Sequence, residues 1–222
     1  TRRSSDLIHC RYCFRRHFDY AANTPGRQQW QRALTYVRND VSITEVIYSG
    51  GDPLAASDAL LAWLTGQIEA IPHVCRLRIH TRLPVVIPAR IDPALLDWLG
   101  SSRLERTLVL HINHANEIDH DVAAAVRRLR DGGVTVLNQS VLLAGINDCG
   151  ERLAALSERL FSAGILPYYL HLLDPVAGAA HFAVSRERAV ALHQGLLARL
   201  PGYLVPRLVR ELPGHPHKLP LA

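Results

Sequence analysis

The sequence of 222 residues contains no methionine, and Lys218 is the only lysine among its 25 basic side chains, so the other 24 are arginine. Aromatic residues make up only 6% of the chain and cysteines number four, which excludes a disulfide-rich miniature protein. A content of 48% hydrophobic and 20% charged residues also excludes a disordered polymer and a fibrous protein. Length and composition therefore predict one globular domain, and α/β barrels often reach this size.

Membrane and export signals are also missing from the sequence. No run of eighteen apolar residues occurs, and the N-terminal residues lack the apolar core of a signal peptide. Together with the low cysteine count, this predicts a cytoplasmic protein with reduced thiols and no membrane partner. The net charge is +5, but the basic residues are scattered apart from pairs such as Arg15–Arg16 and Arg127–Arg128. We therefore expect no nucleic-acid partner.

Short β-rich runs alternate with amphipathic stretches along the chain. The six strand candidates are Ile43–Tyr48, Arg76–His80, Thr107–Asn113, Val134–Leu137, Leu166–Leu172 and Tyr203–Val209. Strands separated by helices of this length are typical of βα units around a parallel sheet. Because no repeat, low-complexity tract or linker interrupts this pattern, we expect residues 1–222 to form a single domain.

Three of the intervening stretches carry apolar residues at helical spacing. One begins near Ser57, one stops at Gly132–Gly133 and one runs from Ser185 to Leu200. The apolar positions in phase are Leu60, Leu61, Leu64, Ile68 and Ile71 in the first, Ile118, Val122, Val126 and Leu129 in the second, and Ala189, Leu192, Leu196 and Leu200 in the third. The spacing predicts three amphipathic helices that bury these faces.

Polar residues follow each strand candidate at its carboxyl end. They are Ser49–Asp52, His80–Arg82, His111–His114, Asn138–Ser140, His171–Asp174 and Glu211. In α/β barrels, the loops at this end of the strands carry the chemistry. Because all six groups would lie at one face of a barrel, we predict the functional site there.

The first motif is the cysteine pair in the segment Cys10–Cys13, which reads CRYC. A single CxxC pair is compatible with a zinc half-site, a redox-active pair or part of an iron–sulfur site. A redox pair would be expected at a thioredoxin-like strand–helix start, and a zinc site would need a second pair. Cys75 and Cys149 are isolated in the sequence, so we interpret them as structural residues.

The segment His9–Phe18, HCRYCFRRHF, resembles the cluster-binding loop of radical S-adenosylmethionine enzymes, specifically those of the lysine 2,3-aminomutase family. In that family the loop reads CxxxCxxC, and its three thiolates hold a [4Fe–4S] cluster. Cys10 and Cys13 match the last two cysteines, whereas Asp6 occupies the position of the first. A carboxylate can coordinate iron, although it is a harder and weaker ligand than a thiolate. The resemblance therefore implies a cluster with Asp6 as a ligand, or a degenerate protein that generates no radical.

The SGGD sequence at residues 49–52 resembles the family segment that binds the methionyl amino group of S-adenosylmethionine. Glycines allow the backbone of such a loop to approach a ligand closely. Together with neighbouring motifs, the resemblance implies seven residues near this cofactor: Tyr12, Ser49, Gly50, Gly51, Asp52, His111 and Gln139.

The only lysine lies in the segment 213–221, PGHPHKLPL, which resembles the family loop that carries the lysine bound to pyridoxal phosphate. Only a primary amine can form a Schiff base with this cofactor, so arginine could not replace Lys218 in that role. The resemblance also implies the residues that bind the substrate lysine. Arg15 would hold its α-carboxylate, for which a forked guanidinium is suited, and Asp174 and Glu211 would hold its ε-ammonium group.

The resemblance covers nearly the whole chain and implies a partial (β/α)6 barrel of the radical S-adenosylmethionine type. It also implies an isomerase that converts L-lysine to β-lysine by a radical 1,2-amino shift dependent on pyridoxal phosphate and S-adenosylmethionine. Within the family, Phe14, His17 and residues 170–182 (LHLLDPVAGAAHF) resemble the branch that supplies (R)-β-lysine for modification of elongation factor P. The alternatives are a catabolic lysine 2,3-aminomutase and the degenerate protein described above.

The N-terminal part of the family, including the strand before the cluster loop, has no counterpart in the sequence. The chain opens almost directly on that loop, so we expect it to be a piece of a longer protein. The expected partners are the small-molecule substrate lysine and a reductant protein of unknown identity, and a homo-oligomer is compatible with the resemblance.

Overall fold

The computed structural model describes residues 10–13, 26–212 and 214–222, and its strands form one seven-stranded sheet. The strands are β1 (Glu45–Tyr48), β2 (Arg76–Thr81), β3 (Glu105–His111), β4 (Thr135–Leu142), β5 (Leu166–Leu172), β6 (Arg207–Arg210) and β7 (Leu219–Pro220). Their order in the sheet follows the chain from β1 to β7. Neighbouring strands from β1 to β6 are parallel, and β7 runs antiparallel to β6.

Helices follow most of the strands. The α-helices are α1 (Arg27–Asn39), α2 (Asp58–Glu69), α3 (Leu83–Val86), α4 (Pro93–Gly100), α5 (His120–Asp131), α6 (Gly150–Ser162) and α7 (Arg186–Arg199). Short 3₁₀ helices are η2 (Pro53–Ala55), η3 (Pro88–Arg90), η4 (Ala115–Glu117), η5 (Ala180–Phe182) and η6 (Gly202–Leu204). In the described ranges, none of these helices combines the length and the apolarity needed to cross a bilayer.

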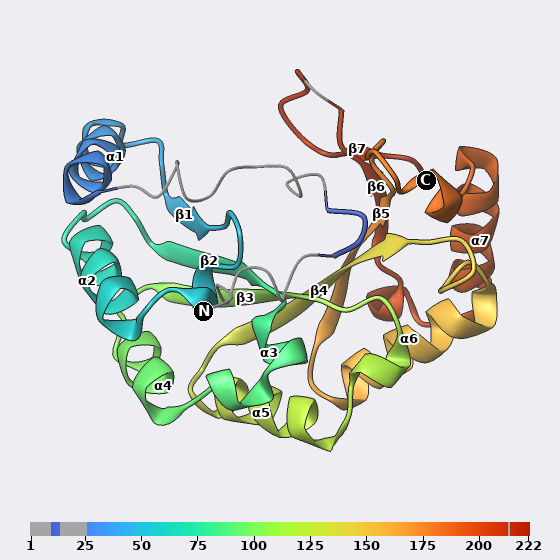
Figure 1. Ribbon diagram of the computed structural model, residues 1–222, viewed down its shortest axis with the longest axis horizontal. Helices are drawn as coiled ribbons and strands as arrows, with labels where there is room; N and C mark the ends of the chain where they lie inside the picture. The colour runs from blue at the N-terminus through green and yellow to red at the C-terminus, as the bar shows by residue number, and fades with distance from the viewer. Residues whose placement is uncertain (1–9, 14–25, 213) are drawn as a thin grey trace.

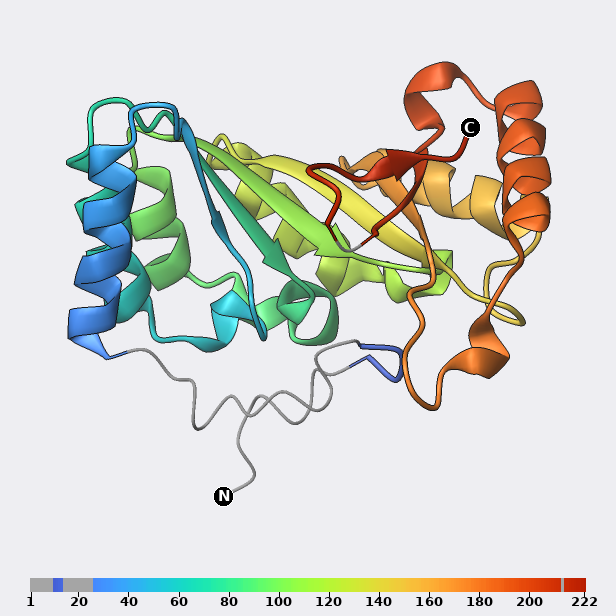
Figure 2. The ribbon, with the colours of Figure 1, turned by 90° about the horizontal axis from the view of Figure 1, so that it is seen from above.

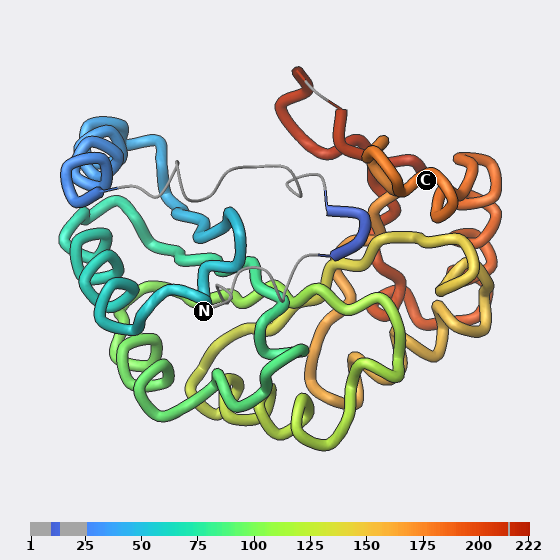
Figure 3. The backbone as a smooth tube through the Cα atoms, in the orientation of Figure 1, coloured from blue at the N-terminus to red at the C-terminus, as the bar shows by residue number. Residues whose placement is uncertain are grey.

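The sheet curls into part of a barrel. Figure 1 shows helices α2, α4, α5, α6 and α7 along its outer side, while the inner side remains concave. The backbone tube in Figure 3 follows the same curve from β1 at one edge to β7 at the other. Figure 2 shows the helices behind the strands and the segment 10–13 near the carboxyl ends of the strands. The predicted partial (β/α)6 barrel is therefore confirmed.

All six predicted strands exist, and β5 has the predicted bounds. The predicted end of β4 at Leu137 is wrong, because β4 continues to Leu142. The polar side chains of Asn138 and Ser140 suggested a loop, but both bind the backbone of Ile112, the residue directly after β3. Asn138 Oδ1 accepts from the Ile112 amide at 2.9 Å, and Ser140 Oγ donates to the Ile112 carbonyl at 2.8 Å.

The last parallel strand also differs from its prediction. The predicted start at Tyr203 is wrong, because residues 202–204 form η6 and β6 begins at Arg207. Pro206 immediately precedes β6, and a proline has no amide hydrogen to donate to the neighbouring strand. The short β7 was not predicted, since two residues are too few to give a periodic signal.

The core lies between the convex face of the sheet and the helices. The predicted apolar face of α2 is buried at Leu61, Leu64 and Ile68, and Ile71 follows it into the core. Leu60 is 37% exposed, so its predicted burial is wrong: it lies at the edge of the buried stripe, about 100° around the helix from Leu61. The apolar positions predicted for the second and third helices are all buried.

Side-chain caps fix where several helices begin. Ser57, Asp92, Asp119 and Ser185 each accept a hydrogen bond from a backbone amide in the first turn of α2, α4, α5 and α7, respectively. Such a cap stabilises a protein by about 1 kcal/mol. At the other end of α5, Gly133 has φ +76°, a left-handed conformation that favours glycine, so the predicted glycine stop is confirmed.

Candidate active site

A cavity of about 370 Å³ opens on the concave side of the sheet, beside the carboxyl ends of the strands. Ligand pockets commonly have volumes of roughly 300–1,000 Å³. The residues predicted from the sequence that line it are Cys10, Tyr12, Cys13, Ser49, Gly50, Gly51, Asp52, His111, Gln139, Asp174, Glu211 and Lys218. The predicted strand-end groups also contribute His80, Thr81, Arg82, His171, Leu172 and Leu173, and Val141 completes the lining. The fold therefore brings segments from both ends of the chain to one site.

Two predicted site residues, Asp6 and Arg15, lie outside the described residues. Asn138 and Ser140, which belonged to a predicted strand-end group, do not line the cavity and are buried in the sheet instead. Gln139 lies between them on β4 and does line the cavity, because successive side chains of a strand point to opposite faces.

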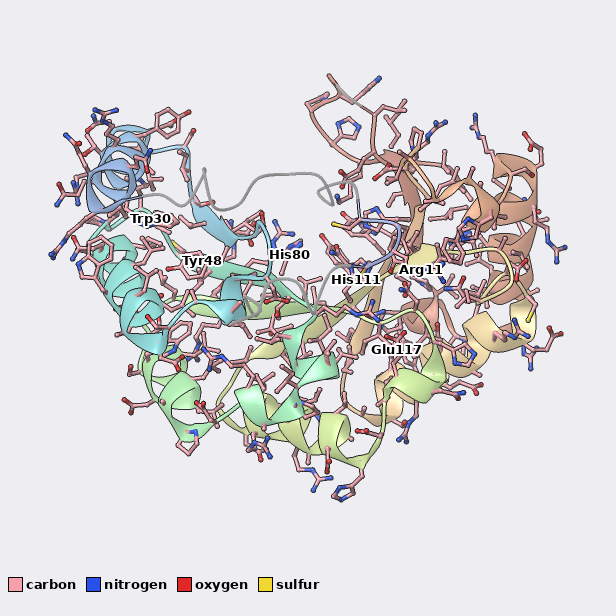
Figure 4. The ribbon with its side chains drawn as sticks, viewed as in Figure 1. Arg11, Trp30, Tyr48, His80, His111 and Glu117 are labelled. Carbon is pink, nitrogen blue, oxygen red and sulfur yellow. The ribbon has the colours of Figure 1, made fainter. Side chains whose placement is uncertain are left out.

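The same alternation separates the two faces of the first strands. Figure 4 shows His80 and His111 on the concave side of the sheet, at the ends of β2 and β3. Tyr48 of β1 lies toward α2, where its hydroxyl is 2.9 Å from Thr65 Oγ1. The cavity side thus carries imidazoles, and the helix side carries the apolar core.

Asp52 joins the loop after β1 to the loop after β2. Its Oδ1 accepts from Thr81 Oγ1 at 2.6 Å and from the Leu54 amide at 3.1 Å. Its Oδ2 accepts from the amides of Arg82 at 2.7 Å and Leu83 at 3.0 Å. Both carboxylate oxygens are therefore occupied by the protein, and Asp52 positions the glycine loop that precedes it.

Gly50 in that loop has φ +131°, a conformation that residues with a Cβ rarely adopt. Gly50 and Gly51 both line the cavity. The glycines consequently present backbone groups, rather than side chains, to a molecule bound beside them.

Tyr12 makes polar contacts with two residues at the carboxyl end of β3, namely His111, its last residue, and Asn113 just beyond it. Its hydroxyl lies 3.2 Å from His111 Nε2 and accepts a hydrogen bond from Asn113 Nδ2. The Tyr12 and His111 rings are stacked with centroids 6.2 Å apart, and Phe182 packs edge-on against Tyr12 at 6.5 Å. Burial raises the pKa of Tyr12, so its phenol stays protonated.

Arg82 bridges the cysteine segment and η4. Its Nη1 donates to Cys10 Sγ at 3.3 Å, and its Nη2 donates to Glu117 Oε2 at 2.7 Å. Burial alone would lower the pKa of Arg82, but attraction to Cys10 and Glu117 outweighs it and raises the pKa. The guanidinium is therefore a fixed positive charge beside the Cys10 sulfur.

Three partly buried imidazoles line the cavity. Burial lowers the pKa of His80 and of His111 to about 4, and that of His171 to about 3. Nearby positive charges add to this effect, namely Lys218 near His80 and His171, and Arg82 near His111. The rings are consequently neutral at pH 7 and can act as hydrogen-bond donors or acceptors.

Lys218 enters the cavity beside the antiparallel pair β6–β7. Its Nζ forms an ion pair with Glu211 Oε1 and lies 5.7 Å from the centroid of the Tyr169 ring. Burial and the charge of Arg78 lower the pKa of Lys218, while Asp174 raises it. Lys218 therefore loses its proton more readily than an exposed lysine once its pairing with Glu211 is released.

Comparison with curated proteins gives several relatives, although no protein-family model matches the chain. The L-lysine 2,3-aminomutase of Escherichia coli is 56% identical over 214 residues, which are 96% of this chain and 63% of that protein. The chain is homologous to the L-lysine 2,3-aminomutases. The enzyme of Haemophilus influenzae is 54% identical over 95% of this chain and 62% of its own length, and that of Clostridium subterminale is 36% identical over 96% and 51%. The chain thus spans less than two thirds of the length of these aminomutases.

Solved structures show the same fold at low sequence identity. SuiB of Streptococcus suis bound to S-adenosylmethionine has a TM-score of 0.65 at 15% identity, covering 92% of this chain and 48% of SuiB. The structure of anSMEcpe with bound AdoMet and a peptide has a TM-score of 0.63 at 12% identity, covering 86% and 55%. At these identities the likeness concerns the fold alone, and it places this aminomutase homologue among the radical S-adenosylmethionine enzyme folds.

Sequence reasoning missed several members of the site. Arg82 was recognised as a strand-end residue, but nothing in the sequence connects it with Cys10 or Glu117, which lie 72 and 35 residues away. His80 and His171 were likewise placed at strand ends without a role. The sequence did offer one indication of a role. Both histidines end predicted strands, and the alternation of side chains along a strand places them on the face that lines the cavity.

Proposed function

We propose that this chain is the catalytic barrel of an isomerase that converts L-lysine to β-lysine by a 1,2-amino shift. The proposed cofactors are a [4Fe–4S] cluster, S-adenosylmethionine and pyridoxal phosphate. The observation that carries the proposal is that Cys10, the 49–52 loop and Lys218 line one cavity, although 208 residues separate the first from the last. Homology to the L-lysine 2,3-aminomutases supports this assignment.

The cysteine segment supplies donors that fit an iron–sulfur cluster. Cys10 and Cys13 are free thiols, both line the cavity, and the Cys13 amide donates to the Cys10 carbonyl at 2.9 Å in a tight turn. The described ranges contain no group of three His, Cys, Asp or Glu side chains able to hold a metal. The proposal therefore needs a further donor from another part of the chain, for which Asp6 is the candidate. When bound, the cluster would supply the electron that cleaves S-adenosylmethionine to a radical.

The residues proposed to hold S-adenosylmethionine offer backbone and neutral groups. Gly50 and Gly51 present backbone at the cavity wall, and Tyr12 and His111 are both uncharged at pH 7. Gln139, next to His111 in the register of β3 and β4, adds an amide. These groups can orient an amino acid and a neutral base by hydrogen bonds and stacking.

The other end of the cavity fits pyridoxal phosphate and lysine. Lys218 supplies the primary amine for covalent attachment of pyridoxal phosphate, which would activate the migrating amino group when bound. Glu211 already holds the Lys218 ammonium, so its carboxylate can hold a primary ammonium at this place. Glu211 and Asp174 are therefore the proposed partners of the ε-ammonium of the substrate. Arg15 is the proposed partner of the substrate α-carboxylate.

Apolar residues complete the wall near the proposed substrate position. The cavity lining that includes Asp174 also contains three apolar side chains, Val141, Leu172 and Leu173. They would exclude water from a reactive radical, while the carboxylates fix the position of the substrate chain.

Within this function, we favour supply of (R)-β-lysine for modification of elongation factor P. Phe14 and His17 resemble that branch, as does the segment 170–182, which comprises the end of β5 and η5. The identities to named aminomutases also fall into two groups, with values of 47–56% for three relatives and 34–37% for five others. A catabolic aminomutase is the alternative, and a degenerate protein remains a second alternative because of Asp6.

Anaerobic reconstitution with iron and sulfide tests the proposal. We expect the protein to bind a cluster, release 5′-deoxyadenosine from S-adenosylmethionine and form β-lysine from L-lysine, with chiral chromatography assigning the product as (R) or (S). An Asp6→Cys variant is the control for the first ligand. A wild-type protein that binds no cluster, beside a variant that does, would contradict the proposal and favour the degenerate protein.

A further inference from the structure

The Arg82 guanidinium donates a hydrogen bond to Cys10 Sγ. The Nη1–Sγ distance of 3.3 Å is within the range for a hydrogen bond to sulfur. Arg82 and Glu117 are only 25% and 22% exposed in their side chains, so water screens this contact weakly.

Two contacts fix the direction of this guanidinium. At its base, the Arg82 amide donates to Asp52 Oδ2 at 2.7 Å. At its tip, Nη2 donates to Glu117 Oε2 at 2.7 Å, and Glu117 Oε1 in turn accepts from the amides of Asn113 at 2.7 Å and His114 at 3.0 Å. The remaining Nη1 is therefore held against the sulfur by contacts that involve no ligand. Glu117 is the last residue of η4, and in Figure 4 it lies on the opposite side of His111 from Tyr48.

A donor held in this way affects the two oxidation states of a cluster differently. Addition of one electron makes the cluster and its thiolates more negative, so a hydrogen bond and a positive charge at a ligating sulfur stabilise the reduced state more than the oxidised one. We infer that Arg82 raises the reduction potential of the cluster through its hydrogen bond to the Cys10 sulfur. This inference depends on the proposed function, because it requires that Cys10 ligates a cluster.

The role concerns a single electron and changes no covalent bond in the protein. The electron comes from an external low-potential reductant, and Arg82 keeps its proton throughout. Arg82 is thus a positioning residue, since it acts on the cluster through the sulfur of Cys10. A higher potential would make reduction of the cluster easier before any contact with substrate.

A redox titration of the reconstituted protein, followed by the electron paramagnetic resonance signal of the reduced cluster, tests the inference. In Arg82→Gln we expect the equilibrium constant for reduction to fall roughly tenfold, which is about 59 mV toward lower potential for a one-electron couple. Arg82→Lys retains the charge but lacks the fork that reaches both Cys10 and Glu117, so we expect a smaller shift in the same direction.

Arg78→Gln is the matched control. Arg78 lies on the same strand, β2, and pairs with Glu45 at 2.8 Å rather than with a thiol, so its loss removes an equal charge without the hydrogen bond to sulfur. We expect a much smaller shift for this variant. Equal shifts in Arg78→Gln and Arg82→Gln would overturn the inference, because a general effect of charge would then account for both.

Iron and sulfide content separate this inference from the proposed function. A wild-type protein without a cluster overturns both. Fully loaded Arg82→Gln with the wild-type potential overturns the inference and leaves the proposed function standing. If Arg82→Gln binds no cluster, Glu117→Gln decides, because it loosens the guanidinium without removing it. A lowered potential in that variant supports the inference, and a wild-type potential overturns it.

Discussion

The two ends of the cavity are built in different ways. At the cysteine end, Asp52, Arg82 and Glu117 form a connected network in which each carboxylate oxygen is bonded to the protein. At the lysine end, one ion pair joins Lys218 and Glu211, and His80 Nε2 is buried without a partner among the described residues. The carboxylates of the first end are satisfied without a ligand, whereas the second end has polar groups that a ligand could satisfy. Loss of Asp52 should therefore mainly reduce stability, whereas loss of Lys218 should mainly reduce activity.

The strongest test is Lys218→Arg at the lysine end. This change keeps the positive charge beside Glu211 but removes the primary amine, so we expect formation of β-lysine to fall roughly 10³-fold or more. The free energy of unfolding should change by less than about 0.5 kcal/mol. Borohydride reduction with pyridoxal phosphate, followed by peptide mapping, should label Lys218 in the wild type and no residue at this position in the variant. Labelling elsewhere in the wild type, with Lys218 unmodified, would contradict the assignment.

Asp52→Ala tests the cysteine end. The change leaves two amides, of Leu54 and Arg82, and the Thr81 hydroxyl without this acceptor. The Leu83 amide keeps a second acceptor, Thr81 Oγ1, at 3.0 Å. We therefore expect a loss of about 3 kcal/mol in the free energy of unfolding. Urea denaturation measures this loss. Asp40→Ala is the control, because Asp40 also accepts two hydrogen bonds, from Ser42, but at the exposed surface. An equal loss of stability in both variants would show that the hydrogen bonds of Asp52 stabilise the fold no more than those of an exposed aspartate.

The imidazoles between the two ends should make stability depend on pH. Their folded-state pKa values of about 3 to 4 lie below the value of about 6.5 for an unfolded histidine. Between these values the unfolded chain binds more protons than the folded one, so stability falls as the pH drops from about 6.5 to 4.

His171→Gln should reduce this dependence. We expect the wild type to lose about 1–2 kcal/mol more than the variant between pH 7 and pH 5, measured by urea denaturation. His120→Gln is the control, since the His120 side chain is 93% exposed on α5 and should leave the pH dependence unchanged. The same pH dependence in all three proteins would show that burial of His171 does not control the titration.

The smallest effect is expected outside the cavity. Ser185→Ala removes the cap of α7, where Ser185 Oγ accepts from the Arg188 amide at 3.2 Å, and should cost about 1 kcal/mol in stability. Cluster loading and β-lysine formation should be unchanged at temperatures where the protein is folded. Ser162→Ala, an exposed serine that binds Arg159 O at the end of α6, should have almost no effect. A change in cluster loading in Ser185→Ala would show that the convex side is coupled to the site.

The sequence was sufficient for the order of elements and for which face of the sheet carries polar groups. Both depend on local periodicity, which is strong in segments such as Leu166–Leu172 and Ser185–Leu200. It was insufficient where a side chain bonds to a distant backbone. Asn138 looked like a loop residue because its partner, Ile112, is 26 positions earlier. Residue types alone do not encode such pairings.

The candidate site shows the same limit. Individual members such as Lys218 could be named from the sequence and a family resemblance, and the structure places them at one cavity. The contacts of Arg82 with Cys10 and Glu117 could not be predicted from the sequence, because each of these residues has several possible partners until the strands are aligned. Asp52 could be named as a cavity residue, but its use as a connector depends on the register of β1 and β2.

The four hydrogen bonds of Asp52 have a mechanical consequence. They connect the glycine loop to the end of β2 and the start of α3 through one side chain. One of the bonded amides belongs to Arg82, whose side chain reaches the Cys10 sulfur. A bound molecule that displaces Gly51 should therefore also change the position of the Arg82 guanidinium relative to that sulfur, because Asp52 connects the two.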